Sequence, residues 1–222
     1  RNFEIRKDVL KYDEVMNEQR KIIYRRRQQI LDGEDLRDAA VDAIDSTIGR
    51  LVDQYCGGEF AEEWNTEGLL EDARTHFPTR VAREQLDAAG DTQAMGEALL
   101  EDATALYAEK EASVGTETLR DIERRVMLSV IDQHWREHLY EMDYLQEGIN
   151  LRAMGQQGPL SEWQREGFDM FEAMMGQIED DFVQYVFHLQ VVVDEQTQSA
   201  VQNVQYSAPS DPVQGSSAIS SA

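Results

Sequence analysis

Three long segments of the chain carry apolar residues at the spacing of one helix face. Apolar positions recur at steps of three and four through residues 3–30, where Gln19 and Arg26 occupy the two steps that lack an apolar residue. The same spacing continues along residues 122–149 and again along residues 160–189. The pattern therefore predicts three long amphipathic helices.

The first of these helices has a clear stop signal but no start signal. Asp32 and Gly33 follow its last apolar turn and predict an end at Leu31, with a new element starting at Glu34 and Asp35. No capping residue comes before the opening stretch RNFEIRK, which has the pattern of a helix interior. We therefore expect the chain to be a piece of a larger protein.

The second and third long helices are expected to form an antiparallel hairpin. The second can extend to Asn150, and Pro159 suits the first position of the third because an amide hydrogen there has no partner within a helix. Only LRAMGQQGP, residues 151–159, joins them. A connection this short brings the chain back along its own path, so these residues are the predicted tip of the hairpin.

An acidic region lies between the first helix and the hairpin. Residues 34–118 contain 21 Asp plus Glu but only 6 Lys plus Arg. Short amphipathic repeats in this region are interrupted by Gly57 and Gly58, by Pro78 and by Gly90. We expect a small helical lobe inserted between the longer elements.

The end of the chain has a different composition. The stretch LQVVVDEQ, residues 189–196, is β-branched and then polar, which predicts one short strand. Residues 195–222 are rich in Gln, Ser and Ala, and therefore bury too little apolar surface to offset the entropy of ordering. The expected fold class is all-α: a long helix, an antiparallel two-helix hairpin, an inserted helical lobe and a flexible tail.

Charge and cysteine content exclude several classes of function. The formal net charge of −23 at pH 7 repels phosphates, which argues against nucleic acid as a specific partner and against an anionic membrane surface as the main one. Cys56 is the single cysteine, so no internal disulfide and no thiolate metal cluster can form. No run approaches the roughly 20 apolar residues that span a bilayer.

One short motif raises the question of catalysis. The pentapeptide HWREH fits the H-x-x-E-H pattern of a zinc peptidase class, in which His134 and His138 bind the metal and Glu137 acts as base. However, Trp135 and Leu139 mark the buried face of this helix, and no third ligand is evident. We interpret the histidines as partly exposed residues that flank a core tryptophan, with a zinc hydrolase as an alternative. Phosphate-binding G-x-x-x-x-G-K-[ST] and nucleophile G-x-S-x-G motifs are absent, so no catalytic, cofactor or metal site is expected.

The first helix also carries a basic cluster in an otherwise acidic chain. Its members are Arg20, Lys21, Arg25, Arg26 and Arg27. Such a cluster is either a solvated helix face or a docking surface for an acidic neighbour, and composition leaves both interpretations open.

Two long stretches carry a family resemblance. They are RNFEIRKDVLKYDEVMNEQRKIIYRRR and, much later, VMLSVIDQHWREHLYEMDYLQEGINLRAMGQQGPLSEWQREGFDMFEAMM. Together they resemble the C-terminal part of SecA, the family of ATP-driven preprotein translocase motors of bacteria. Their order and separation match the family as well, whereas the acidic region matches only by position and helical character.

The resemblance implies a domain organisation. Residues 1–36 resemble the long helix of the helical scaffold domain, and residues 37–116 resemble the helical wing domain. Residues 117–190 resemble the remainder of the scaffold, including a two-helix finger with its tip at residues 151–159. Residues 191–222 resemble the start of the C-terminal linker.

The resemblance also implies a role for the fingertip. In the family the tip enters the cytoplasmic mouth of the SecYEG channel and contacts the polypeptide being moved, with a bulky residue at the position of Met154. The contacting residues expected here are Leu151, Arg152, Met154, Gln156 and Gln157. An unbranched thioether adapts to many side chains, which suits contact with any unfolded substrate.

The long first helix is implied to act as a lever between the finger and the nucleotide-binding domains, which lie upstream in the family. Those domains use ATP and Mg, whereas no cofactor is expected in this chain. The candidate contacts with them are Arg6, Arg20, Lys21, Arg25, Arg26 and Arg27.

The partners implied by the resemblance are the SecYEG channel, unfolded preprotein with its signal peptide, and the protein's own nucleotide-binding domains. A homodimer is a further option, because a helix with an exposed apolar stripe can pair with a copy of itself. The implied location is the cytoplasm, with peripheral association at the inner membrane. A free-standing helical adaptor that binds amphipathic helices through its methionine-rich hairpin is the alternative from another class.

Overall fold

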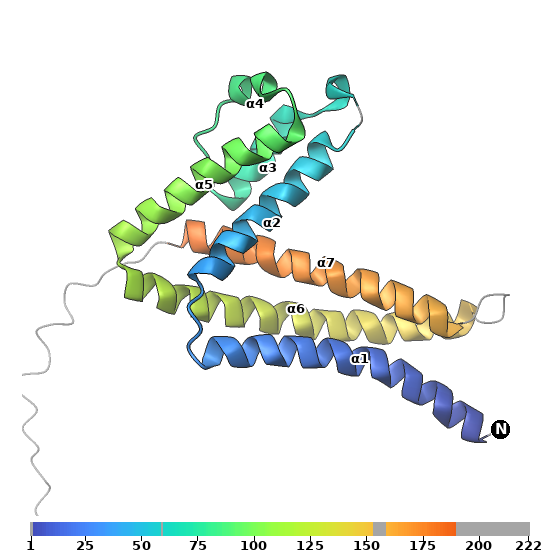
Figure 1. Ribbon diagram of the computed structural model, residues 1–222. Coiled ribbons are helices and arrows are strands. Elements are labelled where there is room, and N and C mark those ends of the chain that lie inside the picture. Colours follow the sequence, from blue (N-terminus) through green and yellow to red (C-terminus); the bar gives the residue numbers. More distant parts are fainter. Residues whose placement is uncertain (1, 59, 153–158, 190–222) are drawn as a thin grey trace, which may run out of the picture. The chain divides into compact units, whose positions relative to one another are not determined.

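The computed structural model describes residues 2–58, 60–152 and 159–189, and these residues are helical with short connections (Figure 1). The helices are α1 (Asn2–Leu31), α2 (Arg37–Cys56), α3 (Thr66–His76), α4 (Arg83–Ala89), α5 (Thr92–Val114), α6 (Thr116–Arg152) and α7 (Pro159–His188), with a short 3-10 helix η1 (Ala61–Glu63). The described residues contain no strand, which confirms the all-α class. Except for Leu189, the predicted strand at residues 189–196 lies outside them.

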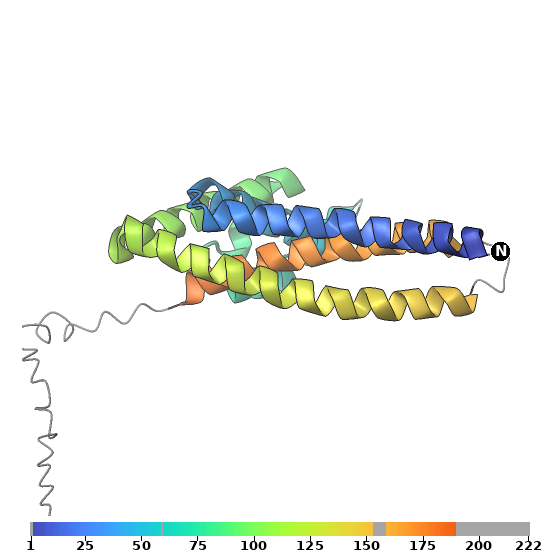
Figure 2. The same cartoon turned by 90° about the horizontal axis from the view of Figure 1, so that it is seen from below.

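Helices α1, α6 and α7 are the three long helices that the apolar pattern predicts. Helices α6 and α7 lie antiparallel along each other, and α1 packs against both (Figures 1 and 2). The predicted hairpin is therefore confirmed. Helix α6 ends two residues beyond the expected Asn150, and α7 begins at Pro159 as expected.

The end of α1 follows the predicted stop signal. Gly33 has φ +92°, a left-handed conformation that glycine adopts without a steric penalty. The amide of Glu34 donates to the Gln29 carbonyl at 3.2 Å, and the amide of Gly33 donates to the Ile30 carbonyl at 3.2 Å. These two bonds form a Schellman motif, which satisfies carbonyls that the helix end would leave unpaired.

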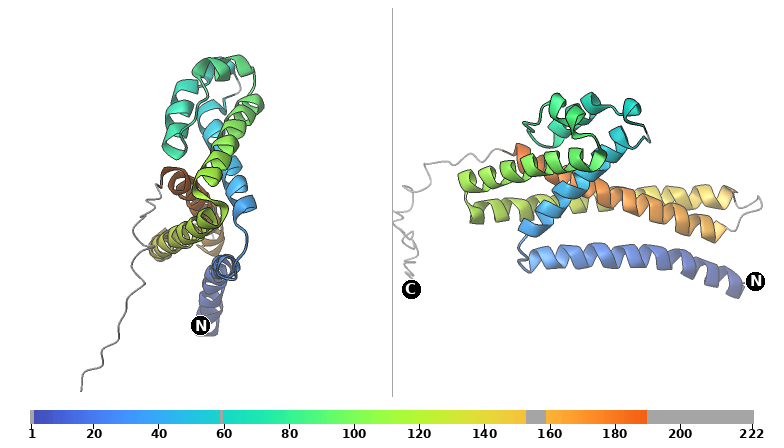
Figure 3. Two further views of the ribbon diagram at one scale, coloured as in Figure 1. Left: turned by 90° about the vertical axis from the view of Figure 1, so that its left-hand side faces the viewer. Right: turned by 45° about the horizontal axis from the view of Figure 1, so that its top comes forward.

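Helices α2 to α5 form the lobe that the acidic region predicts (Figure 3). Helix α2 packs against α3, α5 and α7, so the lobe rests on the hairpin. The starts of α3 and α5 are capped by side chains: Asn65 accepts from the Gly68 amide at 2.9 Å, and Asp91 accepts from the Ala94 amide at 2.7 Å. Gly90, with φ +81°, separates α4 from α5 as its helix-breaking character predicts.

The apolar faces meet in one large core and one small cluster. The large core combines side chains of the lobe with the lobe-side halves of α1, α6 and α7. The small cluster lies nearer the tip of the hairpin and has the buried members Met142, Leu145, Ile149 and Trp163. No described helix has the length and apolar character needed to cross a membrane.

Candidate functional site

The fingertip predicted from the sequence is only partly covered by the structure. Leu151 and Arg152 form the last residues of α6, but their side chains lie outside the described part of the chain. Met154, Gln156 and Gln157 fall between the described ranges. The structure therefore establishes the hairpin that carries the tip and leaves the contacts of the tip as a prediction.

The predicted basic cluster on α1 divides into two groups. Arg27 donates two hydrogen bonds to the Asp132 carboxylate on α6, at 2.6 and 2.9 Å, and Arg26 pairs with Glu34 at 2.7 Å. The hydrogen bond from Arg27 to Asp132 raises the pKa of that guanidinium. These two arginines therefore fasten α1 within the chain.

The other basic side chains of the cluster face outward. Arg20, Lys21 and Arg25 are exposed. Lys21 pairs with Glu18 one turn away at 2.7 Å, whereas Arg20 and Arg25 have no ion pair with the described residues. The side chain of Arg6 lies outside the described part. Arg20 and Arg25 are thus the members that remain available for a partner.

A buried polar contact joins all three long helices. The side-chain amide of Gln19 on α1 donates to the Gly167 carbonyl on α7 at 2.8 Å. Its oxygen lies 2.9 Å from Nε2 of His138 on α6, which places the imidazole proton on Nε2 because an amide oxygen only accepts. Gln19 lies at a position where the helical spacing predicts an apolar residue, and this contact explains why the residue there is polar.

His138 corrects the expectation that both motif histidines are partly exposed. His134 is half-buried, but His138 is buried and packs against the rings of Trp135 and Phe171, with centroids 5.6 and 5.8 Å away. Burial lowers the pKa of His138, so the neutral ring is favoured at neutral pH. The expectation failed because α1 covers this side of α6, which the sequence of α6 alone does not reveal.

The two histidines do not converge on a metal. Nε2 of His134 lies 2.8 Å from the Asp181 carboxylate on α7, while Nε2 of His138 is directed to Gln19. Glu137 is exposed and accepts from Gln133 at 3.3 Å. Within the described ranges, no group of three His, Cys, Asp or Glu side chains is placed to hold a metal ion. The arrangement favours the structural interpretation of the HWREH motif.

The pKa of His138 predicts a pH-dependent stability. Because folding lowers this pKa below its usual value of about 6.5, the unfolded chain takes up the proton first as the pH falls. The stability that the neutral His138 ring contributes to the folded chain is fully present above about pH 6.5, and it is lost as the pH falls through the folded pKa. When the pH is lowered from 7.5 to 5.5, the free energy of unfolding of the His138→Gln variant should fall by less than that of the unmodified chain. Urea titration followed by circular dichroism measures both values. His188→Gln, which removes an exposed histidine of α7, is the matched control and should retain the full pH dependence.

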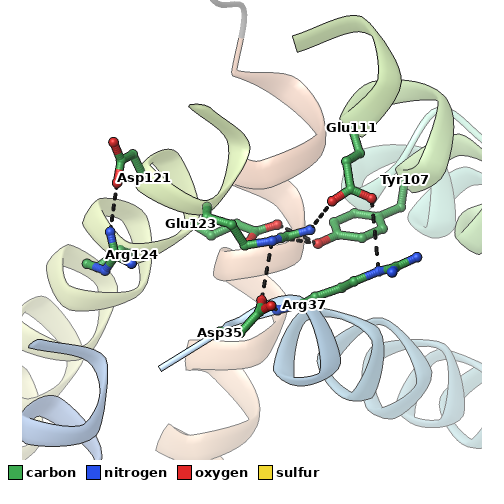
Figure 4. A network of polar contacts seen from close by, with 8 residues as sticks. Asp35, Arg37, Tyr107, Glu111, Asp121, Glu123 and Arg124 are labelled. Atoms are coloured by element: carbon green, nitrogen blue, oxygen red, sulfur yellow. Dashed lines mark hydrogen bonds and ion pairs between the residues drawn. The ribbon is translucent and has the colours of Figure 1, made fainter. Parts of the chain in front are cut away.

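A second polar centre lies where the lobe meets α6, at residues that the sequence interpretation missed (Figure 4). Glu123 on α6 has no exposed surface and accepts a hydrogen bond from the Tyr107 hydroxyl on α5 at 2.6 Å. Arg120 pairs with both Glu123 and Glu111 and lies 3.3 Å from the Asp35 carboxylate. This network connects the loop before α2 with α5 and α6.

The electrostatics of this network favour the paired state. Burial, reinforced by the bond to Glu123, raises the pKa of Tyr107 and keeps its hydroxyl protonated as a donor. Burial is the largest single influence on Arg120 and acts to lower its pKa, but the hydrogen bonds and charges of Glu123 and Tyr107 together outweigh burial, so the net shift is upward. A sequence signal for the site did exist: Glu123 lies one turn from both Leu119 and Met127, on the buried stripe of α6.

The lobe is also fastened to α7. Arg50 on α2 pairs with Glu179 at 2.7 Å and with Asp180 at 2.6 Å. The ammonium of Lys110 on α5 donates to the carbonyls of Phe187 and Leu189, both at 2.8 Å, and so satisfies carbonyls at the end of α7. The arrangement holds helices in fixed positions and, among the described residues, presents no catalytic constellation.

Comparison with known proteins agrees with this architecture. The family described as the SecA Wing and Scaffold domain matches residues 1–190. The chain is 47% identical over 203 residues to protein translocase subunit SecA 1 of Streptomyces avermitilis, an alignment that covers 89% of this chain and 22% of that protein. It is 46% identical over 215 residues to SecA of Streptomyces coelicolor, with 94% of this chain and 22% of that protein covered.

A relative from another genus shows the same relation. SecA of Kineococcus radiotolerans is 45% identical over 226 residues, covering 94% of this chain and 25% of that protein. The chain thus spans about a quarter or less of the length of the curated relatives it matches. On the family match and these identities, the chain belongs to the SecA family and contains its wing and scaffold domain.

Proposed function

We propose that this chain transmits motion within a bacterial protein translocase, from the ATP-hydrolysing domains of the full-length protein to the SecYEG channel. Relatives of the chain are named protein translocase subunits. The proposal places α1 as the lever and the α6–α7 hairpin as the finger. The protein would then work in the cytoplasm and at the inner face of the plasma membrane.

The observation that carries the proposal is the fastening of α1 to the hairpin at separate points along its length. Gln19 contacts both α6 and α7, and Arg27 binds Asp132 two turns further along. Two such points restrain both sliding and rotation of α1, because each requires a particular register. A displacement of α1 therefore moves the hairpin with it.

The basic side chains of α1 supply candidate contacts with the motor. Arg20 and Arg25 are exposed and without an ion pair in the described residues, so they are the strongest candidates for an acidic surface on the nucleotide-binding domains. Lys21 and Arg6 remain proposed contacts of the same kind. Arg27 fixes the lever to α6, whereas Arg26 pairs with Glu34 in the connection that follows the lever.

The tip of the hairpin is proposed to contact the translocating chain. Helix α6 ends at Arg152 and helix α7 begins at Pro159. Met154 therefore belongs to the connection between two long helices. A flexible thioether accommodates varied side chains, as a sequence-independent grip on unfolded preprotein requires. Leu151, Gln156 and Gln157 would contribute to the same contact.

Site-specific crosslinking tests this function. In a full-length SecA that carries this chain in place of its matching segment, a photo-crosslinker at position 154 should capture both the preprotein and the channel during ATP-driven transport. The same probe at Glu84, an exposed position on α4 of the lobe, is the control and should capture neither efficiently. Active transport without crosslinks from position 154 would refute the fingertip role.

A further inference from the structure

A pocket of about 420 Å³ opens where the end of α1 and the start of α2 meet α6 and α7. Its apolar floor consists of Met175, which is half-buried, and of four side chains that expose at most 4% of their surface: Ile23, Met127, Ile131 and Ile178. Two small residues of α2, Ala39 and Ala43, leave room beside this floor. The two methionines make the floor adaptable, because an unbranched thioether changes rotamer at low cost.

The rim of this pocket is acidic. Its carboxylates are Glu34, Asp35, Asp38, Asp42 and Glu179, and the one basic residue in the lining is Arg26. Three of the five carboxylates already have a guanidinium partner within the chain. The pairs are Glu34 with Arg26, Asp35 with Arg120, and Glu179 with Arg50.

The remaining two carboxylates are available to a ligand. Asp38 and Asp42 are exposed, and neither has an ion pair or a side-chain hydrogen bond with the described residues. They stand four residues apart on α2, which places them one above the other on the same helix face. The pocket therefore combines an apolar floor with two unpaired negative charges about one helical turn apart.

This combination selects the chemistry of the occupant. Lys and Arg lay an aliphatic stem on apolar surface while the charged head reaches a polar rim. Two carboxylates one turn apart match two basic residues one turn apart on a second helix. The chain's own residues 190–222 do not fit, because they include no Lys or Arg.

We propose that this pocket is a docking site for a basic amphipathic helix of a protein partner. Basic residues at i and i+4 of that helix pair with Asp38 and Asp42, and an aliphatic side chain between them enters the apolar floor. The site lies at the start of the lobe and uses neither the fingertip nor Arg20 and Arg25. Its occupation can therefore be measured without either of those proposed transport contacts.

A binding experiment with the 222-residue chain tests the site. The probe is a fluorescent synthetic helix of Leu and Lys, about 15–20 residues long, with its lysines one turn apart. Fluorescence anisotropy should show saturable binding, and Asp38→Asn combined with Asp42→Asn should weaken it by about tenfold. Ala39→Leu, which fills the pocket without changing the charge, should weaken it similarly while circular dichroism stays unchanged.

The matched control is Asp45→Asn combined with Asp53→Asn. Both residues are exposed carboxylates of α2 outside this pocket, so this variant changes the net charge by the same amount. It should alter the affinity by less than about twofold. Equal losses in the two double variants, or equal binding of a peptide with the same residues in scrambled order, would overturn the proposal. It would also fail if light scattering showed a dimer that the Asp38 and Asp42 variant dissociates, since a second copy would then fill the pocket.

Discussion

Replacing Glu123 with alanine is expected to lower the free energy of unfolding of this chain by about 3 kcal/mol. Glu123 is fully buried, and its removal leaves the Tyr107 hydroxyl without its acceptor and Arg120 with one fewer carboxylate. The loss should fall at the lower end of the range for broken buried ion pairs, because Glu111 and Asp35 still neutralise Arg120. Urea unfolding followed by circular dichroism gives the value directly.

Glu141→Ala provides the control for this substitution. Glu141 is an exposed residue of the same helix, so the exchange of side chains is identical but nothing buried is disturbed. Its effect should stay within about 0.5 kcal/mol. Glu123→Gln retains an acceptor for Tyr107 and should fall between the two. If Glu123→Ala and Glu141→Ala were equally stable, the network would contribute nothing to joining lobe and scaffold.

The second large effect is expected from Trp163→Ala, at about 3–5 kcal/mol of local stability in the tip-side half of the hairpin. Trp163 is 1% exposed and is the largest member of the small cluster formed with Met142, Leu145 and Ile149. Because this cluster is separate from the large core, its loss should open the tip-side half while the lobe stays folded. Hydrogen exchange read by mass spectrometry distinguishes local from global opening.

Phe168→Ala is the control for this substitution. Phe168 is an aromatic residue of α7 as well, but its side chain is 60% exposed. Exchange rates in α6 and α7 should therefore change little in this variant. Equal acceleration of exchange in the lobe and in the tip-side half of Trp163→Ala would show that the two apolar clusters unfold as one unit. The finger would then have no independent stability.

Local sequence signals predicted the three long helices, the end of α1 and the start of α7. The stop at Asp32 and Gly33 became a Schellman motif, and Pro159 opens α7. These predictions succeeded because turn conformations and helix starts depend on a few neighbouring residues, whose steric and hydrogen-bonding properties are intrinsic. The hairpin followed from the same signals, since its connection is too short for another arrangement of two helices so long.

The polar centres were much harder to predict from the sequence. Arg27 binds Asp132, which is 105 residues away in the sequence. Gln19 contacts His138, and these two residues are separated by 119 positions. Glu123 carried a signal on the buried stripe of α6, but its partners on α5 became evident only in the structure. A charged residue on an apolar stripe shows that compensation is needed, without showing which residue supplies it.

The sequence by itself determined the end of α1 and the start of α7, that α6 and α7 fold into a hairpin, and which family the chain resembles. All three rest on local conformational preferences or on the order of residues, which are properties of the chain before it folds. The tertiary structure alone decided that His138 is buried, that Arg26 and Arg27 are paired within the chain while Arg20 and Arg25 have no ion pair with the described residues, and that an acidic pocket lies beside α2. These features depend on which helix covers which face, and packing between distant segments sets that burial.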